Sequence, residues 1–436
     1  YIQGYQNETE ELGEKQLQDT IEKLKQEYRK KDCVILYFIG LTESYEGEGY
    51  DRKNLKIPQN QEELLAEIAE TVGKDHIAAI SFGGAPMDFS FEKNVGAILH
   101  MYLGGQAVGE SVADLISGEV NPSGKLAETI PFSEKDTPAW RYFAPPNDDV
   151  EYRESIFVGY RYYETFHVPV KYPFGYGLSY TSFSYSELNV PEVYSGGKIQ
   201  IRFKIKNIGK VSGAEIAQLY ICPIESDVIR SHIELKEFQK IYLHPGEEKE
   251  VILELDERSF SVYDVEKKAF SMLSGKYQIC IGASVHDLQL KANMEVVGNS
   301  YFRNERELFP DYFREQPHGM EISAEQFYQL LGGEPKHDKE KKRGEYTVYD
   351  SYQDVVNVSM FGKFVRGVVH IGLKIILGGK SERDPAFKMV KMGVEEGNLE
   401  GLIATSGGIA TPKLIDMLVY NANKKYLQAF KRLLKK

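Results

Sequence analysis

Two different patterns of apolar and polar positions follow one another along the chain. In the first third, short apolar runs such as "CVILYFI" (33–39) and "HIAAISF" (76–82) precede segments in which apolar residues recur every three or four positions. The clearest such stripe, within "NQEELLAEIAETVGK", consists of Leu64, Leu65, Ile68 and Val72. The pattern predicts strands that alternate with helices, which is typical of a mostly parallel sheet in an α/β sandwich.

Three helices are expected in this first part. One is the striped segment, which would begin at a capping box formed by Asn60 and Glu63. The segments "NVGAILHMYLGG" (94–105) and "GQAVGESVADLISG" (105–118) predict the other two.

Beyond residue 185 the apolar positions alternate with a period of two. The runs that show this are "KIQIRFKIKNIG", "AEIAQLYICP", "EFQKIYLHPGEEKEVILEL" and "GKYQICIGAS". Short strands separated by turns, without helices between them, predict a β-sandwich of the fibronectin or immunoglobulin type.

The remaining patterns complete the predicted domain organisation. Residues 301–345 are polar and loop-like, and helical periodicity returns from Val355 onward. In "FVRGVVHIGLKIILGG" the polar residues Arg366, His370 and Lys374 predict an amphipathic helix and no membrane span. The expected parts are an α/β sandwich domain (1–140), a Tyr-rich connector (141–184), a fibronectin-like β-sandwich (185–297), a linker (298–354) and a basic helical tail (355–436).

The charge of the chain is divided unevenly. The net charge is −12 over 436 residues, which argues against nucleic acid as a partner. Residues 341–436 hold 17 Lys and Arg against 9 Asp and Glu, a net of +8, so residues 1–340 carry −20. Two interpretations stay open for the tail: it folds back onto the acidic body, or it docks on a membrane surface or a partner.

Cysteine and histidine give no sign of a metal or a cofactor. Cys33, Cys222 and Cys280 lie in separate apolar runs, without metal-ligand spacing or a disulfide framework. Buried thiols in a reducing, cytoplasmic compartment are therefore expected. The nine histidines show no paired ligand spacing. The chain begins at Tyr1 without a signal peptide, and we expect it to be cut from something longer.

An acidic loop follows the first apolar run directly. The stretch "GLTESYEGEGYDR" (40–52) lies in a connection of about 19 residues, far longer than βα connections usually are. In a right-handed βαβ unit this loop lies at the carboxyl edge of the sheet, where such folds bind ligands. The loop is either solvated surface or the carrier of a carboxyl group that takes part in acid/base chemistry.

Four ordered motifs resemble one family. They are "EGEGYDR", "AILHMYLGGQAVGESVADLISGEVNPSGKLAETIP", "YRESIFVGYRYYE" and "YPFGYGLSYTSFSYSEL". Together they resemble glycoside hydrolase family 3, in the bacterial β-glucosidase branch with a fibronectin type III-like domain, over roughly residues 1–295. The tail motif "SGGIATPKLIDML" resembles the helical C-terminal extension of some of these enzymes.

The resemblance implies a mechanism and a set of site residues. Family members are retaining glycosidases in which a (β/α)8 barrel supplies the nucleophilic aspartate and the α/β sandwich supplies an acid/base glutamate. Glu48 fits the acid/base role. Glu46 is the alternative because the acidic cluster leaves the alignment ambiguous, and Glu43 is a further one. Asp51 and Arg52 match the motif as substrate-binding residues and would shape the loop through a charge-assisted pair.

The chain also departs from the family pattern. Nothing reads as eight βα repeats, and the aspartate–tryptophan nucleophile motif is missing, since Trp140 follows Ala139. One interpretation is the C-terminal part of a β-glucosidase that hydrolyses terminal β-D-glucosyl residues, inactive as an isolated chain. The other is a barrel-less protein that binds carbohydrate or a partner without catalysis.

Overall fold

The computed structural model describes residues 2, 13–28, 33–42, 45–47, 51–52, 54–143, 150–298, 304–335, 341–379 and 384–434. These residues form two compact units. One comprises residues 1–85, 91–103 and 337–436, and the other comprises residues 86–90 and 104–336. Each unit is described by itself below.

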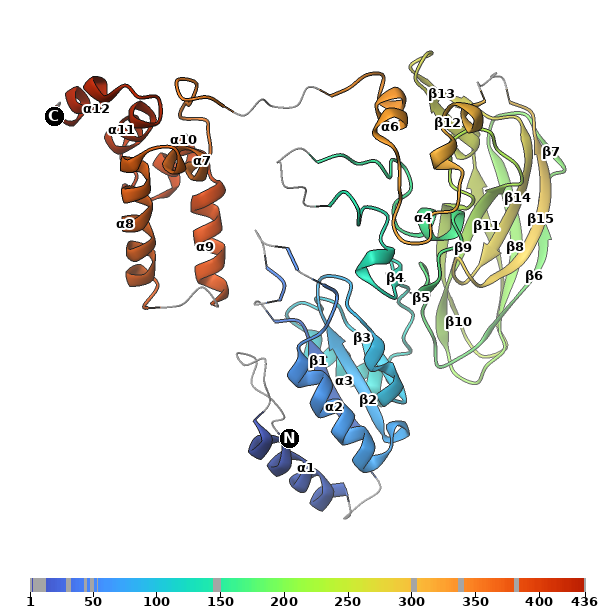
Figure 1. Ribbon diagram of the computed structural model, residues 1–436. Helices are drawn as coiled ribbons and strands as arrows, with labels where there is room; N and C mark the ends of the chain where they lie inside the picture. The colour runs from blue at the N-terminus through green and yellow to red at the C-terminus, as the bar shows by residue number, and fades with distance from the viewer. Residues whose placement is uncertain are drawn as a thin grey trace. The chain divides into compact units, whose positions relative to one another are not determined.

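The N-terminal part of the first unit contains a three-stranded parallel sheet. Its strands are β1 (Ile35–Gly40), β2 (Ile77–Phe82) and β3 (Ala97–His100), in the order β1-β2-β3 (Figure 1). The helices of this part are α1 (Glu14–Tyr28) and α2 (Gln59–Val72), followed by the 3₁₀ turn η1 (Lys74–His76), and a further turn, η2 (Ser90–Asn94), precedes β3. The predicted apolar stripe of α2 is buried, which explains why this segment becomes a helix at this place.

Two expectations for this part are wrong. Residues 94–105 do not form a helix, because Ala97–His100 pair with β2 as the edge strand β3. A short apolar run does not distinguish a helix from a strand, and the pairing with β2 decides here. The capping box is also absent: α2 begins after Pro58 without a side-chain cap, and Asn60 lies buried inside the helix.

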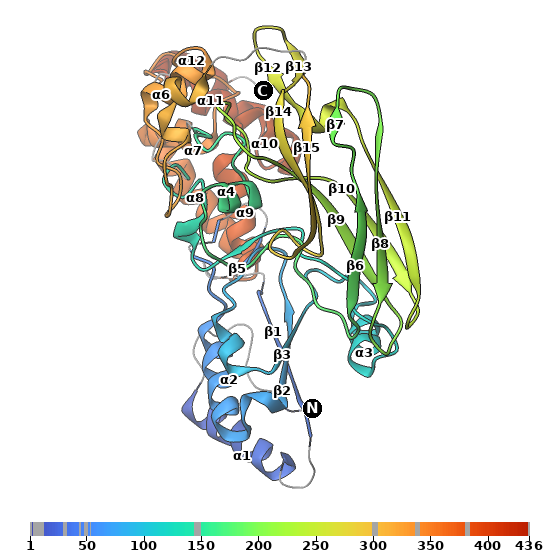
Figure 2. The same ribbon diagram turned by 90° about the vertical axis from the view of Figure 1, so that its right-hand side faces the viewer.

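The second unit contains a β-sandwich (Figures 1 and 2). One sheet has the order β10-β9-β14-β15-β7 and the other has the order β11-β8-β6. The strands are β6 (Phe183–Asn189), β7 (Val193–Tyr194), β8 (Ile199–Asn207), β9 (Gly213–Pro223), β10 (Glu234–Leu243), β11 (Glu248–Leu255), β14 (Gly275–Gly282) and β15 (Leu288–Val296). The ribbon β12 (Ser261–Asp264) with β13 (Ala269–Met272) follows the turn η4 (Glu257–Phe260). The predicted fold class, an α/β sandwich followed by a β-sandwich and a helical tail, is confirmed.

Side chains from both sheets form the core of the sandwich. Phe203 on β8, Leu219 on β9 and Tyr277 on β14 belong to one buried cluster. The other face of β9 is covered as well, because Tyr220 packs against Tyr160 and Phe174 of the connector. This double cover explains why β9 is buried along nearly its whole length.

The connector and the segment after the sandwich pack on each other. The connector contains α4 (Tyr160–Thr165) and β5 (Val170–Tyr172), and it is preceded by α3 (Val108–Ser117), β4 (Ile130–Pro131) and η3 (Glu134–Asp136). The segment after the sandwich contains α5 (Glu305–Leu308), η5 (Pro310–Tyr312) and α6 (Ala324–Leu331). Tyr312 and Met320 are buried against Tyr162 and Phe157. The expectation of a loop-like segment is therefore wrong for α5, η5 and α6, where a few buried apolar side chains outweigh the polar composition.

The C-terminal tail has a core of its own. Its helices are α7 (Tyr352–Asn357), α8 (Met360–Ile376), α9 (Pro385–Glu396), α10 (Leu399–Thr405), α11 (Pro412–Ala422) and α12 (Tyr426–Leu434). Val355, Leu399 and Leu418 lie in its buried cluster. The Asn423 side chain joins the segment that precedes α7 to the end of α11: its Oδ1 accepts from the Tyr346 N–H at 3.0 Å, and its Nδ2 donates to the Tyr346 carbonyl at 2.7 Å. Within the described ranges, no helix is both long and apolar enough to span a membrane.

Candidate functional site

The site predicted from the sequence lies where β1 ends. Gly40 is the last residue of this strand, and a Cβ atom there would come within 2.5 Å of the Phe82 carbonyl oxygen. The next residue, Leu41, donates its N–H to that same carbonyl at 3.0 Å. Only glycine allows β1 to approach the end of β2 this closely while the chain turns into the acidic loop.

A buried amide fixes the strand end to helix α2. Gln61 accepts the Gly40 N–H at 2.8 Å and donates to the Gly40 carbonyl at 3.0 Å. The backbone carbonyl of Gln61 accepts a hydrogen bond from the Tyr37 hydroxyl at 2.7 Å. Because Gln61 is buried, these bonds are shielded from water and hold the end of β1 against the start of α2.

Within the acidic loop, Glu46 reaches across the sheet edge. Its two carboxylate oxygens lie 2.9 and 3.0 Å from the backbone nitrogen of Gly84, in the turn after β2. The loop after β1 is thus attached to the loop after β2, at the carboxyl edge of the parallel sheet. Glu46 thus lies at the carboxyl edge of the sheet, the position that the sequence predicts for the acidic loop.

Arg52 lies at the end of the acidic loop. Its Nη2 donates to the Lys56 carbonyl at 3.1 Å. Burial lowers the pKa of Arg52, and the nearby negative charge of Glu46 partly offsets this effect. Asp51, the expected ion-pair partner, is exposed, and its pairing with Arg52 stays a prediction. The acidic neighbour that raises the Arg52 pKa is Glu46.

The structure brings together only part of the predicted site. Glu46, Asp51 and Arg52 belong to the described residues. The proposed acid Glu48 and the further alternative Glu43 lie outside the described residues. The assignment of Glu48 therefore stays a prediction.

One residue at this edge was missed in the sequence. His100 ends β3, and its Nδ1 lies 2.9 Å from the Ser81 hydroxyl oxygen of β2. Its ring lies 4.1 Å from the ring of Tyr102. Burial lowers the pKa of His100 to about 4, and the contact with Ser81 offsets only part of this effect. The signal was available, since His100 follows an apolar run, but the expected helix over residues 94–105 concealed its place at a strand end.

His100 gives the stability of the protein a specific pH dependence. In the unfolded chain its pKa is near 6.5, so below that pH the unfolded state binds a proton that the folded state resists down to about pH 4. The stability that depends on neutral His100 is complete above pH 6.5 and falls as the pH falls toward 4. In thermal unfolding at pH 7.5 and at pH 4.5, His100→Gln should lose less stability between the two pH values than the wild type. Equal losses in both proteins would contradict this prediction.

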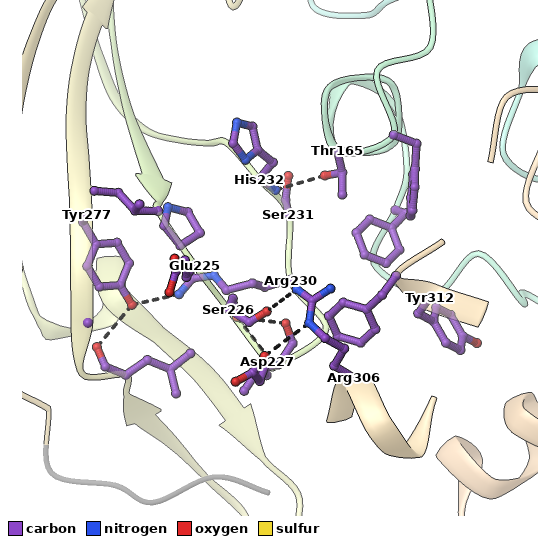
Figure 3. A pocket seen from close by; sticks show the side chains of 18 of the residues that line it. Thr165, Glu225, Ser226, Asp227, Arg230, Ser231, His232, Tyr277, Arg306 and Tyr312 are labelled. Carbon is purple, nitrogen blue, oxygen red and sulfur yellow. Dashed lines mark hydrogen bonds and ion pairs between the residues drawn. The ribbon is translucent and has the colours of Figure 1, made fainter. Parts of the chain in front are cut away.

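The second unit contains a large cavity. It has a volume of about 1360 Å³ and is lined by the connector, the sandwich and residues 304–315 (Figure 3). Arg230 donates to the Tyr277 hydroxyl at 2.9 Å, and Arg306 lies 3.2 Å from Asp227. Of the described candidate residues, neither Glu46, Asp51 nor Arg52 lines this cavity.

Metal and disulfide chemistry find no support in the described ranges. In these ranges no group of three or more His, Cys, Asp or Glu side chains is placed to hold a metal ion. Cys222 and Cys280 are buried on neighbouring strands with their sulfur atoms 3.8 Å apart, and both are free thiols.

Known proteins resemble the chain in both of its first domains. The description "Glycosyl hydrolase family 3 C-terminal domain" matches residues 1–180, and "Fibronectin type III-like domain" matches residues 215–285. A "Thermostable beta-glucosidase B" of Acetivibrio thermocellus is 41% identical over 298 residues, which cover 68% of this chain and 38% of that protein. An "Exo-alpha-(1->6)-L-arabinopyranosidase" of Bifidobacterium breve is 36% identical over 273 residues, covering 63% of this chain and 36% of that protein.

Solved structures of β-glucosidases are similar to this chain as well. The GH3 β-glucosidase of Bifidobacterium adolescentis superposes with a TM-score of 0.64 at 34% identity, over 68% of this chain and 43% of that one. β-Glucosidase 3B of Thermotoga neapolitana, in complex with α-D-glucose, superposes with a TM-score of 0.59 at 34% identity, over 65% of this chain and 40% of that one. The chain thus spans less than half the length of the relatives it matches. The chain therefore carries the C-terminal domain of glycoside hydrolase family 3, followed by a fibronectin type III-like domain, and resembles the C-terminal part of the family's β-glucosidases.

Proposed function

We propose that the chain provides the acid/base half of a retaining β-glucosidase-like hydrolase. Its substrate is a β-glucoside or oligosaccharide, from which terminal non-reducing β-D-glucosyl residues are removed. Glu48 is the acid/base, and the nucleophilic aspartate belongs to a (β/α)8 barrel. The observation that carries this proposal is the attachment of the acidic loop to the carboxyl edge of the sheet by the contact between Glu46 and Gly84.

The chemistry requires two carboxyl groups with different tasks. In a retaining mechanism they stand about 5–5.5 Å apart, one attacking the anomeric carbon and the other protonating the leaving oxygen. Glu46 has both carboxylate oxygens within hydrogen-bond distance of the Gly84 N–H, which suits a residue that holds the loop in place. A proton donor has to turn toward the glycosidic oxygen, and this difference supports Glu48 over Glu46.

The two charged residues of the motif divide their roles in this proposal. Arg52 acts on the loop, through the Lys56 carbonyl and the charge of Glu46. Asp51 is exposed, and its carboxylate is available to accept a sugar hydroxyl.

The relatives suggest where sugar specificity resides. Similar C-terminal parts occur in proteins named β-glucosidase and in proteins named L-arabinopyranosidase. Residues that β-glucosidases and L-arabinopyranosidases have in common cannot distinguish glucose from arabinose. We infer that specificity rests mainly on the barrel.

An aryl β-D-glucoside assay tests this division of labour. We expect no hydrolysis by the 436-residue chain alone, and hydrolysis when the same chain follows a family barrel in one polypeptide. Hydrolysis by the chain alone would overturn the two-part site. If the fusion is folded but inactive while the chain alone binds oligosaccharides in calorimetry, the non-catalytic binding protein is the better description.

A further inference from the structure

Helix α8 exposes a continuous apolar stripe. The exposed fractions are 85% for Met360, 68% for Phe364, 53% for Val368, 60% for Ile371 and 73% for Ile375. These residues follow one another at intervals of three or four, so they lie on one face of the helix. The five side chains are called the α8 stripe below.

The opposite face of α8 packs into the core of the tail. Val365 is buried in the tail cluster, and Gly362 packs so closely that a Cβ atom there would lie 2.4 Å from the Val356 carbonyl oxygen. Helix α8 is therefore apolar on two sides, and the tail covers only one of them. A long apolar stripe left in water is the usual mark of an interaction surface.

The last helix repeats the pattern. On α12, five large apolar side chains are exposed by 49–79%, namely Tyr426, Leu427, Phe430, Leu433 and Leu434. Ala429 is the buried residue of this helix. Two separate helices of the tail thus present apolar faces to solvent.

Both helices carry only positive charge. The segment from Met360 to Ile376 contains Lys363, Arg366 and Lys374 and no acidic residue, and no acidic residue follows Asp416 to the end of the sequence. Lys363 and Lys374 are exposed, and on the helix they lie along one border of the α8 stripe. The surface therefore combines apolar side chains with a cationic border on one side.

We propose that the tail binds to an anionic lipid surface, with the α8 stripe immersed between the headgroups. Amphipathic helices that lie in a membrane interface combine an apolar face with Lys and Arg at its border. A second copy of the chain fits less well, because it would bring the same positive charges together without acidic partners. At about 1.5 Å per residue, the 17 residues of α8 give a helix about 25 Å long, which lies along the surface rather than across it.

Vesicle co-sedimentation of the full 436-residue chain tests the proposal. We expect binding to vesicles of phosphatidylcholine mixed with phosphatidylserine, weak binding to phosphatidylcholine alone, and weaker binding at high salt. Phe364→Glu and Ile371→Glu should each lower the partition coefficient by roughly tenfold or more. Phe238→Glu is the matched control, because Phe238 is 59% exposed on β10 of the sandwich, and it should bind like the wild type.

Three results would overturn the proposal. The first is equal binding to vesicles with and without the anionic lipid. The second is no binding by a wild type that dimerises in analytical ultracentrifugation and whose dimer is lost in Ile371→Glu, which would identify a second copy as the occupant. The third is a wild type that stays monomeric, does not bind vesicles and is destabilised by Ile371→Glu. This result would show that another part of the chain covers the stripe. Because no activity is measured, these results are independent of the proposed hydrolase function.

Discussion

Replacement of Glu48 by glutamine in a barrel-containing form of the protein is expected to reduce the hydrolysis of β-glucosides with poor leaving groups by about 10²–10⁴-fold. The reason is that an alkoxide or a weakly acidic phenoxide leaves only when it is protonated in the transition state. Glutamine cannot donate that proton. Substrates with activated aryl leaving groups need little protonation, so their glycosylation step should be partly spared. The measurement is a comparison of kcat/KM for the two substrate classes.

Glu46→Gln is the control for this experiment. Its carboxylate lies against the Gly84 N–H, so its loss should loosen the loop and slow both substrate classes by similar factors. If Glu48→Gln left both classes unaffected, Glu48 would not be the acid. If instead Glu46→Gln showed the leaving-group dependence, Glu46 would take that role.

Replacement of Phe203 by alanine should destabilise the β-sandwich by about 3–5 kcal/mol. Phe203 is 1% exposed on β8, lies opposite Val251 of β11, and stacks with Tyr185 at 6.4 Å between ring centroids. Truncation leaves a cavity between two sheets whose strands are tied by backbone hydrogen bonds, so the space cannot close easily. The loss in the free energy of unfolding is measured by urea titration, and hydrogen exchange of the β8 and β11 amides shows that the loss is local to the sandwich.

Phe238→Ala provides the comparison for this variant. Phe238 is an aromatic residue of the same sandwich, but it is 59% exposed. Its truncation should change the stability by less than about 0.5 kcal/mol, as is usual for surface positions. Similar effects at both positions would mean that the sandwich core is not organised around Phe203.

The regular strands of the sandwich could be predicted because their burial alternates. β11, with its buried Val251, Leu253 and Leu255, shows the pattern most clearly. β9 breaks the alternation, since the connector covers its second face, but a continuous apolar run still indicates a strand. β3 was missed because an edge strand this short depends on its pairing with β2, which no local pattern reveals.

The candidate site was predictable in its place and not in its contacts. The length of the loop and its position after β1 indicated the carboxyl edge of the sheet. The bond from Gly84 to Glu46 joins residues far apart in the sequence, and nothing near either residue announces it. The same holds for Ser81 and His100, which meet only because β2 and β3 pair in parallel.

The tail illustrates how a protein acquires a new part. Asn423 ties the stretch around Tyr346 to the end of α11, so the chain returns close to where it entered, and the helices in between enclose their own core. A segment with its own buried core can be gained or lost in a single recombination event without exposing that core to water. The tail, and with it the lipid binding proposed above, can therefore be attached or removed while the family 3 domains remain under separate selection.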